Sequence, residues 1–317
     1  MRPALAIGGY AVLMAWCLPA LLSRLTGRGV SVRLGLAAWI AAMVSVLASA
    51  VIALQFLIRA AVAGWPRFSE AVCRSVAGGA CTPVVYRSAL FELSVAAVAV
   101  FATLAAAVAV WRYRQRTQRA HRRSQAHAEA ARITGRSLPG TGAVVLDDPR
   151  PAAYCVAGRP AVIVLTSGAL AVLDPAQLGA VLAHERAHLA GRHHALVTLI
   201  KGLDAAFPGV PLFSRGLAEV TRLSEMSADD AAARASGHTT LAAALLAIGT
   251  GTAVTGAVLR AGTRGALAAA AYAVPARVER MLRRPSRRCH AAFGGALAGV
   301  LTLLIILPSA LTVIAAR

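Results

Sequence analysis

Four long apolar runs, each without a charged side chain, constrain this chain more than any other feature. A helix needs about 20 apolar residues to cross a bilayer. Buried core helices are the alternative, but four such runs within 317 residues favour membrane spans. The first run is also long for a signal peptide, so we expect an uncleaved span. The runs are Ala4–Leu22, Leu34–Ile58, Leu93–Trp111 and Ala291–Ala316.

Arginine gathers at the ends of these runs. The chain carries 33 Lys and Arg residues against 13 Asp and Glu residues, a formal net charge of +20. Such an excess suits either nucleic-acid binding or the cytoplasmic flanks of membrane spans. Because the arginines sit at span ends, we expect no direct nucleic-acid binding and assign them to the cytoplasmic side. They are Arg24, Arg28 and Arg33 after the first run, Arg112, Arg114, Arg116, Arg119, Arg122 and Arg123 after the third, and Arg277, Arg280, Arg283, Arg284, Arg287 and Arg288 before the fourth.

These flanks agree on one topology, in which both chain termini lie outside and residues 59–88 form an outer loop. Of the 13 acidic residues, 11 lie between Glu129 and Glu279 and mark the soluble part. The sequence therefore predicts a multi-pass cell-membrane protein in contact with lipid. Its parts are a three-span region over residues 1–111, a cytoplasmic domain over 112–288 and the fourth span over 289–317.

A fifth apolar run, Leu241–Leu259, is uncharged but rich in glycine and threonine. If it crossed the membrane, the arginines at 277–288 would lie outside, against the positive-inside rule. We therefore predict that it is a helical part of the cytoplasmic domain.

Two of the five cysteines, Cys73 and Cys81, share the predicted outer loop. Oxidation is favoured there, so we consider a disulfide between them, with free thiols as the alternative. No Cys-x-x-Cys pair exists for a structural zinc site.

The cytoplasmic domain contains the pattern His-x-x-x-His with a glutamate after the first histidine, formed by His184, Glu185 and His188. On a helix, positions i and i+4 share one face, so both imidazoles can bind one zinc ion while the glutamate acts on water. Asp174 and Pro175 are suitable for the start of this helix. Gly191 is suitable for the end of the helix. The apolar face of the helix is formed by Leu178, Val181, Leu182 and Leu189.

A catalytic zinc ion needs a third protein ligand and one open position. Glu225 and Asp229 lie one helical turn apart in the next acidic segment. Glu225 would complete a His-His-Glu ligand set, and Asp229 would orient one histidine by accepting its other N–H. The alternative for this segment alone is a solvated acidic helix face.

At this point the chain resembles the gluzincin membrane proteases, in which Glu-x-x-x-Asp follows His-Glu-x-x-His. It is similar more widely to the BlaR/MecR-type antirepressor metalloproteases, over most of residues 85–317. The segments 151–170 and Val278–Leu282 carry that likeness beside the zinc motifs. The resemblance implies an α+β zinc metalloprotease domain on the cytoplasmic side, between the third and fourth spans.

The chain departs from that family in two places. It ends at Arg317, so we expect no penicillin-binding sensor domain after the last span. Relatives often have an aspartate shortly after the second histidine, where this chain has His193 and His194. We interpret these two as a solvated pair at a helix end, with His193 as a further ligand the less favoured alternative.

The motif predicts that Glu185 takes a proton from water and passes it to the leaving amine. His238 and Arg234 are candidate donors to the oxyanion, and the sequence does not choose between them. The apolar run Ala161–Leu165 predicts a strand. An edge strand beside the zinc helix would bind an extended peptide, whereas a buried strand would not.

The resemblance implies a regulatory endopeptidase that cleaves a cytoplasmic repressor of the BlaI/MecI type, itself, or both. One alternative is a quality-control protease of the HtpX type. Another is a non-proteolytic membrane signal transducer, which an intact Glu185 disfavours because a binding protein needs no general base. The sequence is compatible with a homodimer.

Overall fold

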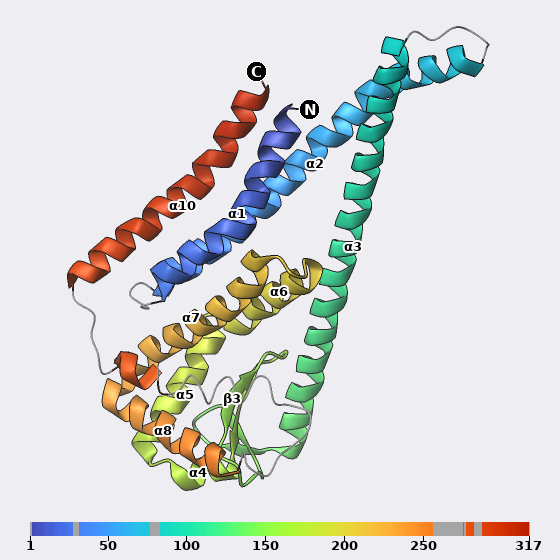
Figure 1. The fold of residues 1–317 in the computed structure, drawn as a ribbon. Coiled ribbons are helices and arrows are strands. Elements are labelled where there is room, and N and C mark those ends of the chain that lie inside the picture. Colours follow the sequence, from blue (N-terminus) through green and yellow to red (C-terminus); the bar gives the residue numbers. More distant parts are fainter. Residues whose placement is uncertain are drawn as a thin grey trace.

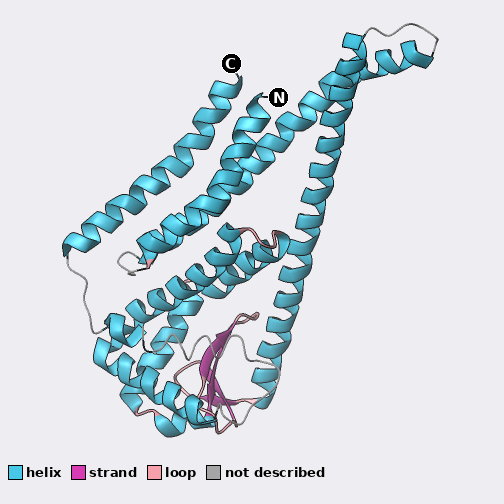
Figure 2. Ribbon diagram, viewed as in Figure 1, coloured by secondary structure: helices cyan, strands magenta, loops and turns pink. Residues whose placement is uncertain are grey.

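The structure is a computed structural model that describes residues 2–27, 32–76, 83–255, 275, 277–281 and 287–316. It is mostly helical, with one small sheet packed among the helices of its lower part (Figure 2). The long helices rise away from that part, and the two termini lie near each other on the side of the helices away from the sheet (Figure 1).

Three helices are long and apolar enough to cross a membrane: Pro3–Thr26, Val32–Arg74 and Ala89–Thr134. They belong to α1 (Arg2–Thr26), α2 (Val32–Val76) and α3 (Pro83–Thr134). The predicted fourth span forms α10 (Arg287–Ala316), whose described apolar stretch, Ala291–Leu307, is shorter. Three spans thus follow from length and composition, and the fourth stays a prediction.

Helices α1, α2 and α10 pack together through small and apolar residues such as Ala38, Ala42 and Leu297. Their outer faces expose large apolar side chains, including Trp16, Val44 and Ile305. A soluble protein rarely leaves so much apolar surface in water, so these faces suit lipid.

The predicted outer loop is largely helical, which corrects that part of the sequence interpretation. Residues 59–76 continue α2, and α3 already begins at Pro83. Because extending a helix that has already formed costs little per residue, a charged and aromatic segment can continue an apolar helix by several turns. At its other end α3 runs unbroken across the expected boundary at residues 111 and 112, down to Thr134.

The sheet has four strands in the order β1-β2-β4-β3. Strand β4 pairs in parallel with β2 and antiparallel with β3, and β1 pairs antiparallel with β2. The strands are β1 (Arg136–Leu138), β2 (Ala143–Leu146), β3 (Ala153–Val156) and β4 (Val162–Thr166).

Of the two alternatives for the strand at Ala161–Leu165, the structure therefore shows the buried strand. Strand β4 lies between β2 and β3, and all five of its residues are buried. A strand buried on both faces is a continuous apolar run, which is the pattern of this segment. The edge strand that contacts the histidine helix is β3.

Helices cover both faces of the sheet. On one face, Val156, Val162 and Val164 pack against Ala128 and Ala131 of α3. On the other face, Cys155, Ile163 and Leu165 pack against α5 (Pro175–Ala190). The short helix α4 (Ser167–Val172) follows β4 directly and begins with the Thr166 side chain accepting the amide of Ala169.

Helix α8 (His238–Thr255) contains most of the fifth apolar run and packs on α5, α4 and α7 (Pro211–Ser236). Leu241 and Ala244 are buried in those contacts. The helix is thus confirmed up to Thr255 and its packing up to Ile248, and residues 256–259 lie outside the described residues.

Helix α7 and its partner α6 (His193–Ala206) also form a hairpin against the membrane helices. Phe213, Val220 and Leu223 of α7 share one core with α1 and α2. A Cβ atom at Gly216 would lie 2.2 Å from the methyl group of Met43, so glycine allows this close approach. One helix, α7, therefore connects the span bundle with the acidic segment at Glu225.

Candidate metal centre

Helix α5 carries the two histidines and the glutamate of the motif. The Asp174 side chain accepts the amide N–H of Gln177, whose own side chain accepts the amide of Asp174, and Pro175 opens the first turn. The helix ends before Gly191, as the sequence predicted. His184, Glu185 and His188 are each 6–7% exposed, so burial fixes their orientation.

Helix α7 brings Glu225 and Asp229 to the same place. It packs along α5, and Asp229 is 1% exposed while Glu225 keeps about a third of its side chain accessible. Val220 and Leu223 anchor one side of α7 in the core shared with the membrane helices. The acidic side chains therefore face the histidines rather than solvent.

His184, His188 and Glu225 offer ligand atoms within 4.8 Å of one another. The two Nε2 atoms are 3.0 Å apart, and the Glu225 carboxylate oxygens lie 3.6 Å from Nε2 of His184 and 3.5 Å from Nε2 of His188.

This arrangement fits one zinc ion. Two nitrogens bound at about 2.0–2.1 Å to a tetrahedral zinc would be about 3.4 Å apart, near the distance between the two Nε2 atoms. Two imidazole nitrogens and a carboxylate are also the donor set of many catalytic zinc sites, which leave a fourth position open.

Asp229 lies beside the other nitrogen of His184, and its orienting role stays a prediction. Its Oδ1 lies 3.2 Å from Nδ1 of His184. Arg277 then fixes Asp229 with two hydrogen bonds, from Nε to Oδ2 at 2.8 Å and from Nη2 to Oδ1 at 2.6 Å. Arg277 also reaches Glu225, with Nη1 3.2 Å from Oε2.

This place of Arg277 was not predicted, because the residue stands among the arginines before the fourth apolar run and was assigned to the flank of that span. The side chain is only 9% exposed, and its partner Asp229 is 48 residues away along the chain. Buried arginine at a carboxylate favours two parallel hydrogen bonds, which is the geometry observed.

The buried charges shift one another's pKa values. Burial alone would lower the pKa of His184, but the Asp229 and Glu225 carboxylates outweigh it and raise the pKa to about 9. Burial would raise the pKa of Glu225, but hydrogen bonds from His184 and His188 hold it far below its usual range. The pKa of Asp229 is lowered in the same sense, against the effect of burial, chiefly by Arg277.

The interpretation of His193 and His194 as a solvated pair is wrong for His193, whereas His194 is exposed. His193 opens α6 and is 7% exposed, with Nδ1 2.9 Å from Nδ1 of His188. Arg192 takes a left-handed conformation with φ of 49°, which turns the chain so that His193 points inward. Gly191 leaves room for this ring, because a Cβ atom there would lie 2.4 Å from Nε2 of His193.

Glu185 and His194 both face β3. The Nε2 atom of His194 lies 3.2 Å from Sγ of Cys155. Burial and the neighbouring Glu185 carboxylate raise the pKa of that thiol well above its usual range, so it stays protonated. Glu185, the predicted general base, thus lies beside the edge strand.

The two oxyanion candidates lie farther along the chain. Arg234 is exposed in the last turn of α7, nine residues from Glu225, or about 14 Å along the helix. His238 begins α8 and its Nδ1 atom is buried. Neither makes a hydrogen bond with the described residues of the cluster, and both stay predictions. Cys81 lies outside the described residues, so the disulfide with Cys73 also stays a prediction.

Comparison with known proteins adds one finding. Residues 114–209 match the sequence model of Peptidase family M48. The matched segment contains His184, Glu185 and His188 but ends before Glu225. No curated protein and no solved structure matches the chain significantly. The match indicates a metallopeptidase domain of a zinc-dependent family.

Proposed function

We propose that this protein is a membrane-embedded zinc endopeptidase that hydrolyses peptide bonds on the cytoplasmic side of the cell membrane. The convergence of His184, His188 and Glu225 beside Glu185 carries the proposal. The family match over residues 114–209 supports peptide hydrolysis independently of that geometry.

His184, His188 and Glu225 would hold the zinc ion. The ion would polarise the attacking water and the scissile carbonyl. Glu185 would accept the proton that the water gives up and return it to the nitrogen of the leaving amine. The water oxygen bonds to the carbonyl carbon as the C–N bond breaks, which leaves one carboxylate and one amine.

Two residues would position the ligands without touching the substrate. Asp229, fixed by Arg277, would accept the N–H of His184, and His193 would accept the N–H of His188. Such contacts choose the tautomer that leaves Nε2 free for the metal. In this chain the acceptor for the second histidine would be an imidazole rather than the aspartate that relatives often have.

The free edge of β3 would bind the substrate backbone. Within the described residues, β3 pairs only with β4, and Cys155 at its centre adjoins Glu185 and His194. An extended peptide added to this edge would pass the general base.

The arrangement of the helices supports a cytoplasmic catalytic domain. The end of α1 with Arg24 and the start of α10 lie toward the domain, whereas both termini lie away from it (Figure 1). Basic residues favour the cytoplasmic side, so the domain shares that side with them. This orientation also supports a fourth span in α10.

The substrate we propose is a cytoplasmic transcriptional repressor of the BlaI/MecI type, or the protein itself, within a signalling pathway. Cleavage of damaged membrane proteins, as in HtpX-type proteases, is the second candidate and fits the same family match. A transducer without proteolysis would have no use for the buried Glu185 beside the ligands.

Purified full-length protein in detergent would test the activity, with casein as a general substrate. We expect cleavage that zinc restores after chelation and that Glu185→Gln abolishes while keeping bound zinc. Zinc-independent cleavage would contradict the proposal. Co-expression with a repressor of the BlaI/MecI type, or with a misfolded membrane protein, then identifies the substrate that only the unaltered protein cuts.

A further inference from the structure

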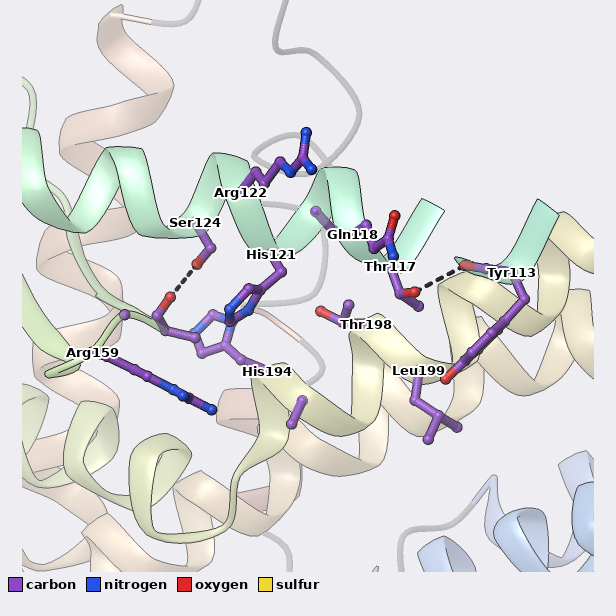
Figure 3. A pocket seen from close by; sticks show the side chains of 14 residues that line it. Tyr113, Thr117, Gln118, His121, Arg122, Ser124, Arg159, His194, Thr198 and Leu199 are labelled. Atoms are coloured by element: carbon purple, nitrogen blue, oxygen red, sulfur yellow. Dashed lines mark hydrogen bonds between the residues drawn. The ribbon is translucent and has the colours of Figure 1, made fainter. Parts of the chain in front are cut away.

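A cavity of about 620 Å³ lies between α3, α6 and the turn that follows β3. Tyr113, Thr117 and His121 enter it from α3, His194 and Leu199 from α6, and Arg159 from the turn (Figure 3). This volume falls in the range of about 300–1,000 Å³ that is typical of ligand sites.

The cavity adjoins the candidate metal centre. His194, which lines it, follows His193 directly and contacts Cys155 at the middle of β3. The other wall, residues 157–159, continues the chain beyond the end of β3. A peptide laid along the free edge of β3 would therefore run from Glu185 into this cavity.

The turn that carries Arg159 is held in place. Its amide N–H donates to Oε1 of Gln125 at 3.0 Å, and Ser124 donates to the carbonyl of Ala157. Gly158 packs against α3 so closely that a Cβ atom would lie 2.6 Å from the Cβ of Ala128. The position of Arg159 thus follows from backbone contacts rather than from its own side chain.

The charges around the cavity are of one sign. Within the described part of the chain, its lining includes no Asp or Glu. The guanidinium of Arg159 makes no hydrogen bond or ion pair with a described residue, whereas Arg150, Arg222, Arg277 and Arg280 each pair with a carboxylate. Thr117, Ser124 and Thr198 add hydroxyl groups, and Leu199 adds apolar surface.

The cavity is closed toward the membrane helices. A Cβ atom at Gly202 would lie 2.7 Å from the ring of Tyr113 and 2.8 Å from Cγ2 of Thr117, so α6 and α3 meet there. The space therefore suits a side chain, or a short stretch of peptide, that enters from the side of β3.

We propose that this cavity is a subsite for an acidic side chain of the polypeptide substrate, with Arg159 as the residue that selects it. Residues 157–159 lie about two to four positions beyond Cys155 at about 3.3 Å each, so the acidic residue would stand about two to four positions from the cleaved bond. This assignment rests on the proposed peptidase function and adds its substrate preference.

A peptide library of mixed sequence, cleaved by the zinc-loaded full-length protein and read by mass spectrometry, tests the assignment. We expect Asp and Glu to be enriched at one position about two to four residues from the cut. Arg159→Gln should remove that preference, and Arg159→Glu should turn it toward Lys and Arg. The loss of kcat/KM on an acidic peptide should be roughly five- to tenfold, mainly through KM.

Arg123→Glu is the matched control, because it changes the charge of an exposed residue of α3 that does not line the cavity. It should leave the preference unchanged. A library cut without acidic preference, or a preference that survives in both Arg159 variants, would overturn the subsite alone. Absence of any cleavage that depends on zinc and Glu185 would overturn the proposed function, and the subsite with it.

Discussion

The candidate metal centre and the α3–α6 cavity adjoin each other, since His193 contacts the centre and His194 lines the cavity. The two groups of polar side chains differ in whether each charged residue has a partner of opposite charge. In the cluster around His184, Arg277 and two carboxylates contact one another or the histidines, and Asp229 is almost fully buried. In the α3–α6 cavity, Arg159 is exposed and has no carboxylate partner among the described residues. Buried side chains of opposite charge that contact one another fix the positions of the residues around them. A charged side chain that has no such partner and lies beside a cavity can bind a ligand of opposite charge.

The comparison therefore separates residues that build the centre from residues that meet the substrate. Changes in the buried cluster should alter chemistry, metal affinity or stability. Changes in the cavity should alter only which substrate is cut.

The largest effect should come from Glu185→Gln. Loss of a general base costs about 10²–10⁴-fold in rate. Zinc content should stay near one ion per chain, because the amide is nearly isosteric and the three ligands remain. Turnover of a peptide and metal analysis of the same preparation measure the two quantities. His184→Ala is the contrasting variant, which should lose both zinc and activity.

The next largest effect should separate a buried ion pair from a more accessible one. Arg277→Leu leaves Asp229 buried without its partner, and breaking such a pair costs about 3–5 kcal/mol in the free energy of unfolding. Arg280→Leu breaks the more accessible pair with Asp230, which is worth about 1 kcal/mol or less. Thermal unfolding in detergent compares the two variants. Equal losses in the two variants would show that the buried pair of Arg277 and Asp229 stabilises the fold no more than the accessible pair does.

A smaller effect is expected from His193→Ala. Removing the group that orients a metal-bound histidine typically lowers metal affinity about 10–100-fold. His193→Asp should keep most of the affinity, since a carboxylate also accepts the N–H of His188. Competition with a zinc chelator measures both variants. If His193→Ala bound zinc as tightly as the unaltered protein, the contact between the two Nδ1 atoms would have no positioning role.

The last effect concerns pH in the metal-free protein. The pKa of His184 is raised from 6.5 to about 9, so the folded state binds its proton more tightly than the unfolded state. That stability is fully present below pH 6.5 and is lost as the pH rises through 9, by at most about 3 kcal/mol. Unfolding in a chelator at pH 6.5 and pH 9 should show the decline, and His184→Gln should reduce it. Stability that instead rises over this range would refute the assigned cause.

The local part of the centre could be predicted from the sequence. Asp174, Gly191 and the spacing of His184 and His188 are features of one helix, and Glu225 followed from the need for a third ligand. Helix ends and helix faces are set by nearby residues, so a single segment contains the information.

The rest depends on contacts between distant segments. Arg277 joins the centre by pairing with Asp229 across 48 residues, and His193 becomes buried because Arg192 turns the chain inward. The position of His193, five residues after His188, was the only feature of the sequence that could have indicated its contact with His188. The sequence left open whether the run Ala161–Leu165 is an edge strand or a buried one, although a fully apolar run is typical of a central strand.

Zinc K-edge absorption of the full-length protein tests the central claim most directly, because it reads the ligands themselves. The account predicts four light-atom ligands, two of them imidazole nitrogens at about 2.0–2.1 Å, with one carboxylate oxygen and one further oxygen. A sulfur ligand at about 2.3 Å, which would implicate Cys155, or three imidazoles, which would implicate His193, would contradict it.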